Sequence, residues 1–362
     1  MSEKKTKIII AGGGTGGHLF PGIAIAEEFL KNEGTEILFV GVGNRLEKKV
    51  FDGLGLPFCT IRIEGVKGKG LKEAIKVLLK LPLSMKESYR IIRNFQPSLV
   101  MGVGGYVSGP VVLVAYLMGI KTAVAEQNAL PGLTNRILGK FADRIFLTYR
   151  ESRKWFPTEK TLVTGNPVRA AFLSARDINK RADKFHVLIF GGSQGARSIN
   201  RIIASALPHL NVKDMGLRIL HQTGNDDLQY MTDIYRRYEV DAEVMPFIQD
   251  MASAYREADL VICRAGATSI AEITIMGKAA VLIPFPYAVD NHQKKNADAL
   301  VKAGAAVMFE EKGLEGAVMA ETIEHFCRHP HLLRHMGRKA ASLGNVRAAA
   351  DIVAASLALI KQ

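Results

Sequence analysis

Two glycine-rich segments and a histidine are the residues whose types and spacing first suggest chemistry. The segment AGGGTGGHLF, residues 11–20, directly follows a run of three isoleucines and contains His18. An apolar run that enters a glycine cluster predicts a strand, a tight turn and a helix, with backbone N–H groups that can bind an anion. A second cluster, GVGGYVSGP at 102–110, follows another apolar run. We therefore expect a diphosphate site on this half of the chain.

Two other interpretations of the first loop stay open. Its glycines could serve only as a tight turn before a helix. Gly12, Gly14 and Gly17 also satisfy the G-x-G-x-x-G pattern of dinucleotide enzymes. That pattern needs an acidic residue at the end of the second strand, where this chain has the glycine-rich residues 41–44. Arg45 could bind a 2′-phosphate, so an NADP enzyme remains an alternative, whereas a G-x-x-x-x-G-K-[ST] loop is absent.

The bulk composition limits the class of protein. The chain has 362 residues, 48% of them apolar, which suits two α/β domains with a core each. Its net charge of +13 favours a polyanionic partner, and it carries no nucleic-acid-binding motif. Cys59, Cys263 and Cys327 are too widely spaced to indicate a zinc site or a disulfide framework.

Short β-branched runs alternate with helical patterns along the whole chain, which predicts parallel sheets with right-handed crossovers. The expected strands are 7–11, 36–40, 99–103, 122–125, 144–147 and 161–163, then 186–190, 218–222, 243–246, 260–263, 280–283 and 306–309. The charged run 176–185 is interpreted as a linker, after which HVLIFGGSQGARSIN (186–200) repeats the order strand, glycine loop, helix. Residues 345–360 are predicted to form a closing amphipathic helix, whose apolar face would carry Val346, Ala349, Val353, Leu357 and Ile360.

The second half carries residues suited to a nucleotide sugar. RAGATSIAE (264–272) follows an expected strand and opens a helix at about Ser269, whose N-terminus favours a diphosphate. Glu272 could accept from ribose hydroxyls, although Ser269 and Glu272 also match a capping box. Gln293 and Asn296 suit sugar hydroxyls or form an ordinary polar helix start. The chain has no D-x-D motif, and we expect no metal and no cofactor.

Seven motifs, taken together in this order, resemble the MurG family of bacterial UDP-N-acetylglucosamine:N-acetylmuramyl-(pentapeptide) pyrophosphoryl-undecaprenol N-acetylglucosaminyltransferases. They are GGTGGH, GVGGYVSGP, EQNALPG, TGNPVR, GGSQGA, RAGATSIAE and PFPYAVDNHQKKNA. The resemblance implies a GT-B fold, in which two Rossmann-like, doubly wound parallel-sheet α/β domains face a central cleft. It implies an acceptor- and membrane-associating domain over 1–165, a UDP-GlcNAc-binding domain over 166–344, and a helix over 345–362 that returns to the first domain.

The implied reaction is an inverting, metal-independent transfer of GlcNAc from UDP-GlcNAc to lipid I in peptidoglycan synthesis, giving lipid II and UDP. It implies a peripheral enzyme at the cytoplasmic face of the cell membrane. Which cell-wall or division proteins it meets is left open. Two further hypotheses are a transferase with another acceptor and a nucleotide-sugar-binding module without turnover.

The resemblance also implies roles for single residues. His18 is the expected general base, with a cap or acceptor-binding role as its alternative and Glu126 as the alternative base. The expected substrate-binding residues are Thr15, Gly16, Gly17, Asn128, Arg169, Ser193, Ile248, Ala267, Thr268, Ser269, Glu272 and Gln293. Phe247 and Ile248 would flank the uracil through an apolar wall and a backbone amide, or in the alternative belong to the core. The acceptor diphosphate is expected at Gly13, Gly14, Gly104, Gly105 and Tyr106.

Residues 66–90 predict a helix that lies on an anionic membrane surface. Lys72, Lys76 and Lys80 recur at i, i+4 spacing beside a leucine-rich face, and Pro82 is expected to end the helix. Each lysine near an anionic leaflet contributes on the order of 1 kcal/mol. In the alternative, the leucines pack on the domain and the lysines are only a solvated face.

Overall fold

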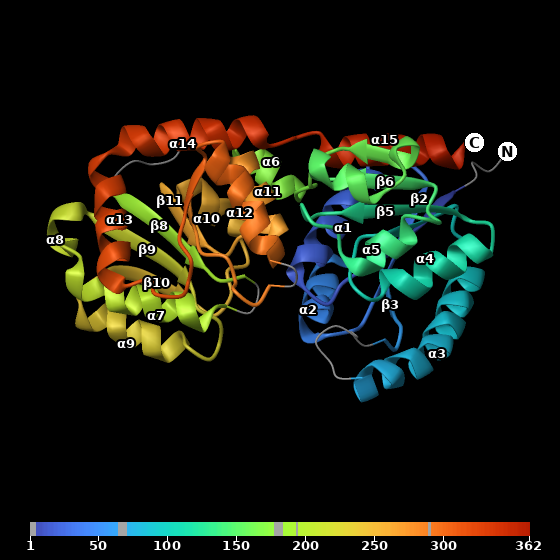
Figure 1. Ribbon diagram of the computed structural model, residues 1–362, viewed down its shortest axis with the longest axis horizontal. Coiled ribbons are helices and arrows are strands. Elements are labelled where there is room, and N and C mark those ends of the chain that lie inside the picture. The colour runs from blue at the N-terminus through green and yellow to red at the C-terminus, as the bar shows by residue number, and fades with distance from the viewer. Residues whose placement is uncertain (1–4, 64–70, 177–183, 193–194, 289–290) are drawn as a thin grey trace. The chain divides into compact units, whose positions relative to one another are not determined.

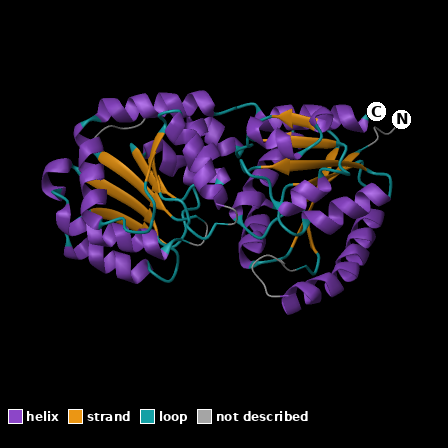
Figure 2. Cartoon of the chain, in the orientation of Figure 1, coloured by secondary structure: helices purple, strands orange, loops and turns teal. Residues whose placement is uncertain are grey.

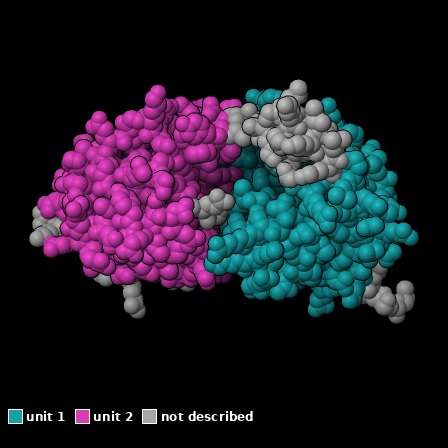
Figure 3. Space-filling view, turned by 90° about the horizontal axis from the view of Figure 1, so that it is seen from below, with its two compact units in different colours: residues 1–169, 345–362 teal, residues 170–344 magenta. Residues whose placement is uncertain are grey.

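The computed structural model describes residues 5–63, 71–176, 184–192, 195–288 and 291–362, with only the backbone of 71–80 and 213–214 (Figure 1). The chain divides into two compact units, residues 1–169 with 345–362 and residues 170–344, which Figure 3 colours separately. The charged run 176–185, interpreted as a linker, lies mostly outside the described residues. Helix α6 (Ala170–Arg176), which precedes this run, packs on α10 and α11 of unit 2, so the boundary between the two units comes before it, after Arg169.

Unit 1 is built on a parallel sheet of seven strands in the order β3-β2-β1-β4-β5-β6-β7. Figure 2 draws strands in orange and helices in purple. The strands are β1 (Thr6–Ala11), β2 (Thr35–Gly41), β3 (Phe58–Thr60), β4 (Leu99–Gly102), β5 (Lys121–Glu126), β6 (Arg144–Leu147) and β7 (Thr161–Val163). The six strands expected here are present. The sequence analysis missed β3, which is a three-residue edge strand held by Phe58 stacking on Phe51.

Helices cover both faces of this sheet because the isoleucines of β1 alternate between two cores. Ile8 and Ile10 belong to the core beneath α1 and α15, whereas Ile9 belongs to the core beneath α3 and α4. The helices of unit 1 are α1 (Gly16–Phe29), α2 (Arg45–Leu54), α3 (Leu71–Phe95), α4 (Ser108–Leu117), α5 (Leu133–Leu138) and α15 (Ala348–Ile360), with 3₁₀ turns η1 (Arg150–Trp155) and η2 (Thr158–Lys160). The fold is thus the expected doubly wound α/β arrangement.

Helix α3 does not end at Pro82, as the sequence analysis predicted, but continues to Phe95. A proline inside a helix removes one backbone hydrogen bond and costs about 3 kcal/mol. The second half of α3 offsets that cost through anchors on unit 1. Ile92 is fully buried, Ser84 Oγ donates to the carbonyl of Arg62 at 2.6 Å, and Glu87 accepts from the Arg62 N–H at 2.7 Å.

Unit 2 has a parallel sheet of six strands in the order β10-β9-β8-β11-β12-β13. These are β8 (Phe185–Phe190), β9 (Leu217–Gln222), β10 (Asp241–Met245), β11 (Leu260–Cys263), β12 (Ala279–Leu282) and β13 (Ala306–Met308). Besides α6, the helices are α7 (Arg197–Ala206), η3 (Leu207–His209), α8 (Val212–Met215), α9 (Leu228–Arg237), α10 (Met251–Glu257), α11 (Ala267–Met276), α12 (His292–Lys302), α13 (Gly316–Arg328) and α14 (Pro330–Leu343). All six strands expected in this half are present, with ends shifted by a residue or two.

Among the described residues, Pro330–Ile360 is the one segment long and apolar enough to cross a membrane, with a mean hydropathy of 1.5 over an 18-residue window. The structure divides it into α14 of unit 2 and α15 of unit 1. Helix α15 buries Ile352, Val353 and Leu359 in the core of unit 1, which explains the apolar composition. Val346 precedes α15 and is exposed, so its predicted place on the apolar face was wrong.

Candidate active site

The first glycine loop joins β1 to α1, and Thr15 is the N-cap residue of that helix. Gly16 and Gly17 begin the helix, which places His18 in its first turn. Gly13 and Gly14 have φ angles of 148° and 85°, which favour glycine. Because Thr15 occupies the cap position, the alternative interpretation of His18 as the helix cap does not hold.

A carboxylate of the chain itself lies against this loop. Glu47 in α2 is 1% exposed, and its Oε1 accepts from the Gly14 N–H at 2.7 Å. Its Oε2 accepts from the N–H groups of Val42 and Gly43 at 3.0 and 2.6 Å. A Cβ at Gly13 would lie 2.0 Å from Glu47 Oε1, so this glycine permits the close approach. The Gly14 N–H that we expected to bind an acceptor diphosphate is therefore already engaged by an anion.

The second glycine loop packs on the first. A Cβ at Gly105 would lie 2.8 Å from the Gly13 carbonyl, and one at Gly104 would lie 2.4 Å from His18 Nδ1. The Gly104 N–H, which we expected beside a diphosphate, donates to Ser108 Oγ at 3.0 Å in the structure. Tyr106 is 42% exposed and so reachable from solvent. Because Gly104 and Gly105 have no side chain, the two loops can pack closely on each other and on His18.

Glu126 at the end of β5 organises the segment that follows it. One carboxylate oxygen accepts from the N–H and the side-chain amide of Asn128 at 2.9 and 3.3 Å. The other accepts from the Gly132 N–H at 3.0 Å and from Asn135 Nδ2 at 2.8 Å. Burial raises the pKa of Glu126, against the opposing effect of these donors. A carboxylate with both oxygens engaged and 3% exposure is a structural anchor, which disfavours the alternative that it is the base.

The remaining expected residue of unit 1 is Arg169. Its guanidinium lies 4.5 Å from the centre of the Phe20 ring, on the first turns of α1. This contact holds a cationic side chain over the helix that carries His18, close to the glycine loop.

In unit 2 the expected donor motif forms a helix that begins earlier than predicted. Helix α11 starts at Ala267, and Gly266 is its N-cap. Thr268 and Ser269 therefore lie in the first turn, and the capping-box interpretation of Ser269 with Glu272 is wrong. The glycine cap leaves the first turn without a bulky side chain beside its N–H groups. Glu272, 6% exposed, lies one turn into the helix.

Gln222, which sequence reasoning missed, connects two parts of the expected donor site. Its Nε2 donates to the Gly192 carbonyl at 2.7 Å, and its Oε1 accepts from the Ile248 N–H at 2.8 Å. The Ile248 N–H that we expected to bind uracil donates to Gln222 in the structure, and the Ile248 side chain is buried. Ser193 lies outside the described residues. The signal in the sequence that could have identified Gln222 was an amide residue at the carboxyl end of a buried strand.

The two amides predicted at the start of α12 differ in their surroundings. Gln293 Oε1 accepts from the Phe285 N–H at 2.9 Å in the first turn. Asn296 is fully buried and its Nδ2 donates to the Ala265 carbonyl at 3.3 Å, so it supports the chain beside α11. Arg264, the first residue of the RAGATSIAE motif, donates from its guanidinium to the carbonyls of Ile283 and Pro284 at 3.0 and 3.2 Å.

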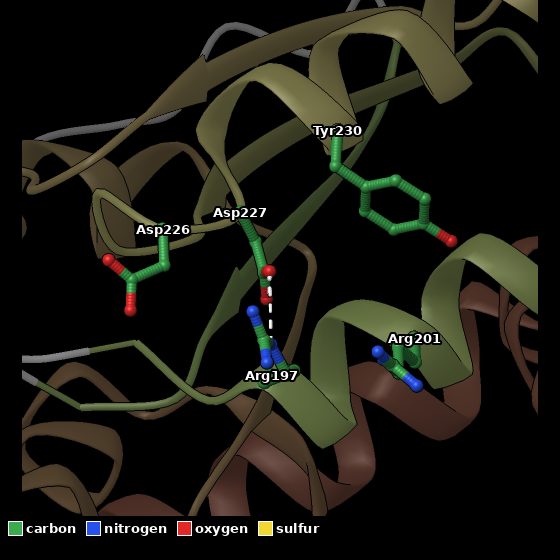
Figure 4. Close-up of a pocket in the computed structure, with 5 residues that line it drawn as sticks. All are labelled: Arg197, Arg201, Asp226, Asp227 and Tyr230. Carbon is green, nitrogen blue, oxygen red and sulfur yellow. Dashed lines mark hydrogen bonds and ion pairs between the residues drawn. The ribbon is translucent and has the colours of Figure 1, made fainter.

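A hollow between α7 and α9 lies outside the expected site residues and is lined mainly by charged side chains. It is lined by Arg197, Arg201, Asp226, Asp227 and Tyr230 (Figure 4). Asp227 pairs with Arg197 at 3.4 Å and accepts from Asn200 Nδ2 at 2.8 Å, so it stabilises the start of α9. In the described part of the chain, no group of three His, Cys, Asp or Glu side chains is placed to hold a metal ion.

Comparison with known proteins decides the family. Residues 8–147 match the glycosyltransferase family 28 N-terminal domain, and residues 186–353 match the family 28 C-terminal domain. The chain belongs to glycosyltransferase family 28.

Within this family the chain is similar to MurG proteins. It is 55% identical to the UDP-N-acetylglucosamine--N-acetylmuramyl-(pentapeptide) pyrophosphoryl-undecaprenol N-acetylglucosamine transferase of Syntrophus aciditrophicus, over 98% of this chain and 99% of that one. A Myxococcus xanthus protein of the same name is 47% identical, over 98% and 94%. The crystal structure of Acinetobacter baumannii MurG has a TM-score of 0.75 and 30% identity, over 97% of this chain and 98% of that one. Family and fold are those that the motifs predicted.

Proposed function

We propose that this chain transfers GlcNAc from UDP-GlcNAc to the pyrophosphoryl-undecaprenol-linked N-acetylmuramyl-pentapeptide, giving lipid II and UDP. The observation that carries the proposal is 55% identity, over almost the full length of both chains, to a transferase named for this reaction. The described motifs of that reaction are in place at the ends of parallel strands, where α/β sheets bind their ligands.

Unit 2 binds the donor in this proposal. The first turn of α11, at Ala267 and Thr268, faces the diphosphate, and the helix dipole stabilises the leaving UDP. Glu272 accepts from the ribose hydroxyls, and Gln293 reaches a sugar hydroxyl through its Nε2. Gln222 keeps the Gly192 loop and the Ile248 wall at a fixed separation, which preorganises the nucleotide site.

Unit 1 binds the acceptor and supplies the base. The acceptor hydroxyl attacks the anomeric carbon of GlcNAc, the bond from that carbon to the UDP oxygen breaks, and the hydroxyl proton passes to His18. We place the acceptor diphosphate at Thr15, Gly16 and Gly17, because they form the N-terminus of α1, where the helix dipole favours an anion. Arg169 over Phe20 adds positive charge on the same helix.

We also propose that the protein works as a peripheral enzyme on an anionic, cytoplasmic membrane surface. The net charge of +13 and the lysine-rich sequence of residues 66–90 support this. Exposed Leu83 and Lys86 of α3 extend the same segment, whereas Met85 packs on the core. The side chains of Lys72, Lys76 and Lys80 lie outside the described residues.

Turnover with UDP-GlcNAc and a soluble lipid I analogue tests the proposed activity. We expect lipid II analogue and UDP in equal amounts, and a kcat about 10²-fold lower in His18→Ala with the donor KM unchanged. His331→Ala, at an exposed histidine of α14, is the matched control. Donor binding without any transfer would favour a binding module, and transfer only to another acceptor would favour a different transferase.

A further inference from the structure

Gln127, which directly follows β5, is buried with 1% exposure beside the expected base. Its Oε1 lies 3.4 Å from His18 Nδ1, and its Nε2 donates to the Ala125 carbonyl at 3.2 Å. The second contact decides which way the amide faces, because a flipped amide would set its oxygen against the carbonyl oxygen. The carbonyl end of Gln127 therefore points at the histidine. We infer that Gln127 is a positioning residue that fixes the tautomer of His18.

The argument for the tautomer follows from hydrogen-bonding capacity. An amide oxygen only accepts, so the nitrogen that faces it must carry a proton. A neutral imidazole has one N–H, and placing it at Nδ1 leaves the lone pair of His18 on Nε2. Nε2 is then the atom that takes the acceptor proton.

Gly104 restrains the same edge of the ring. A Cβ at this position would lie 2.4 Å from Nδ1 and 2.7 Å from Cε1 of His18, so the bare backbone packs directly on the imidazole. The ring is thus held along its Nδ1–Cε1 edge by the Gly104 backbone and at Nδ1 by the Gln127 amide.

The contact with Gln127 strengthens during the proposed reaction. At 3.4 Å it is a long hydrogen bond for a neutral pair. When Nε2 takes the proton, Nδ1–H becomes a charged donor, and charge-assisted hydrogen bonds are shorter and stronger. Gln127 thereby stabilises the charged ring more than the neutral one. Because Gln127 is itself uncharged, it does so without holding a proton on His18 beforehand.

The tautomer is measurable on the full-length protein without turnover. In ¹⁵N-labelled wild type at high pH, we expect His18 Nδ1 to resonate as a protonated nitrogen and Nε2 as an unprotonated one. In Gln127→Met, which keeps the side-chain length but removes the acceptor, we expect a mixture of tautomers. Gln229→Met, at an exposed glutamine of α9, is the matched control and leaves the His18 signals unchanged. An unchanged Nδ1–H tautomer in Gln127→Met overturns the inference.

Gln127→Glu gives a second test, because it strengthens the acceptor beside His18 Nδ1, whereas Gln127→Met removes it. A carboxylate within hydrogen-bond distance favours the protonated ring, so the acidic limb of the kcat/KM profile moves up by about one pH unit or more. In Gln127→Met, kcat falls about 10-fold while the donor KM stays unchanged. A merely structural role for Gln127 would lower thermal stability and move neither the pH limb nor the tautomer.

The inference rests on His18 being the base, and the two can fail separately. If His18→Ala keeps its kcat, the base assignment in the proposed function fails, whatever the ¹⁵N spectra show. If His18→Ala loses activity but neither the tautomer nor the pH limb responds to Gln127, the positioning role alone fails.

Discussion

The carboxylate of Glu47 accepts a hydrogen bond from the backbone N–H of Gly14 at 2.7 Å, in the loop whose sequence predicts a bound anion. These residues are 33 positions apart in the chain. Glu47 also closes a capping box with Asn44 at the start of α2, and Asn44 Nδ2 donates to the Gly14 carbonyl at 3.1 Å. The glycine loop is therefore shaped by an internal anion before any substrate arrives. A dinucleotide pyrophosphate would compete with that anion for the Gly14 N–H.

Glu47→Gln is expected to destabilise unit 1. The amide would place donors against the N–H groups of Gly14, Val42 or Gly43, and burying such unsatisfied groups costs about 3 kcal/mol in free energy of unfolding. Chemical denaturation measures this loss. Glu33→Gln, at an exposed glutamate, should change the free energy of unfolding by less than about 0.5 kcal/mol. Equal stabilities of the two variants would contradict the anchoring role of Glu47.

Glu272→Ala is expected to raise the KM for UDP-GlcNAc while α11 stays folded. Loss of charge-assisted bonds to two hydroxyls costs roughly 2–3 kcal/mol of donor binding, which is about 30- to 150-fold in KM. Since Gly266 caps α11, the substitution removes no cap. Steady-state kinetics with a circular dichroism melt separate the two effects, and Glu321→Ala on the exposed face of α13 is the control. A lowered Tm with an unchanged KM would count against donor binding by Glu272.

His221 makes the stability of unit 2 depend on pH. Burial lowers the pKa of His221 to about 3, and the neutral ring lies 2.9 Å from the Tyr235 hydroxyl and 3.1 Å from Asn200 Oδ1. An unfolded chain takes up this proton near pH 6.5, whereas the folded one does not. The contribution of His221 to the free energy of unfolding should therefore be fully present above about pH 6.5. Below that pH, the free energy of unfolding should fall by about 1.4 kcal/mol per pH unit as the pH drops toward 3.

Urea unfolding of unit 2 at several pH values checks this dependence. His221→Gln should show a shallower slope than wild type, and His331→Gln, at an exposed histidine, should keep the wild-type slope. Parallel slopes in wild type and His221→Gln would show that the ring is not held neutral.

Membrane association is expected to follow the lysines of residues 66–90. The wild type should float with phosphatidylglycerol vesicles, and less with neutral vesicles or at high salt. Reversing Lys72, Lys76 and Lys80 to glutamate should abolish flotation and leave transfer to a soluble acceptor intact. Reversing exposed Lys302, Lys312 and Lys339 changes the net charge equally and should not abolish it. Equal loss in both triple variants would assign the effect to net charge alone.

Local sequence determined most of the architecture. Buried strands such as β1 and β8 are short apolar runs with β-branched residues that end at glycines. This pattern predicts a strand without any information on which strands lie beside it in the sheet. The seven motifs identified the family through their resemblance, taken together and in order, and the family models match the same chain. Local pattern failed at Pro82, because packing of the second half of α3 outweighs one lost hydrogen bond, and at β3, whose three residues carry too little pattern.

Tertiary structure alone decided which polar groups meet. Gly14 and Glu47, His18 and Gln127, and Gln222 and Ile248 are 33, 109 and 26 positions apart. In unit 1, β1 lies between β2 and β4, so segments distant in sequence end at the same edge of the sheet. Buried N–H groups must find acceptors, and the acceptor is whichever side chain that strand order brings within reach. Sequence thus determined where the loops are, and strand order determined which of their N–H groups the chain itself already engages.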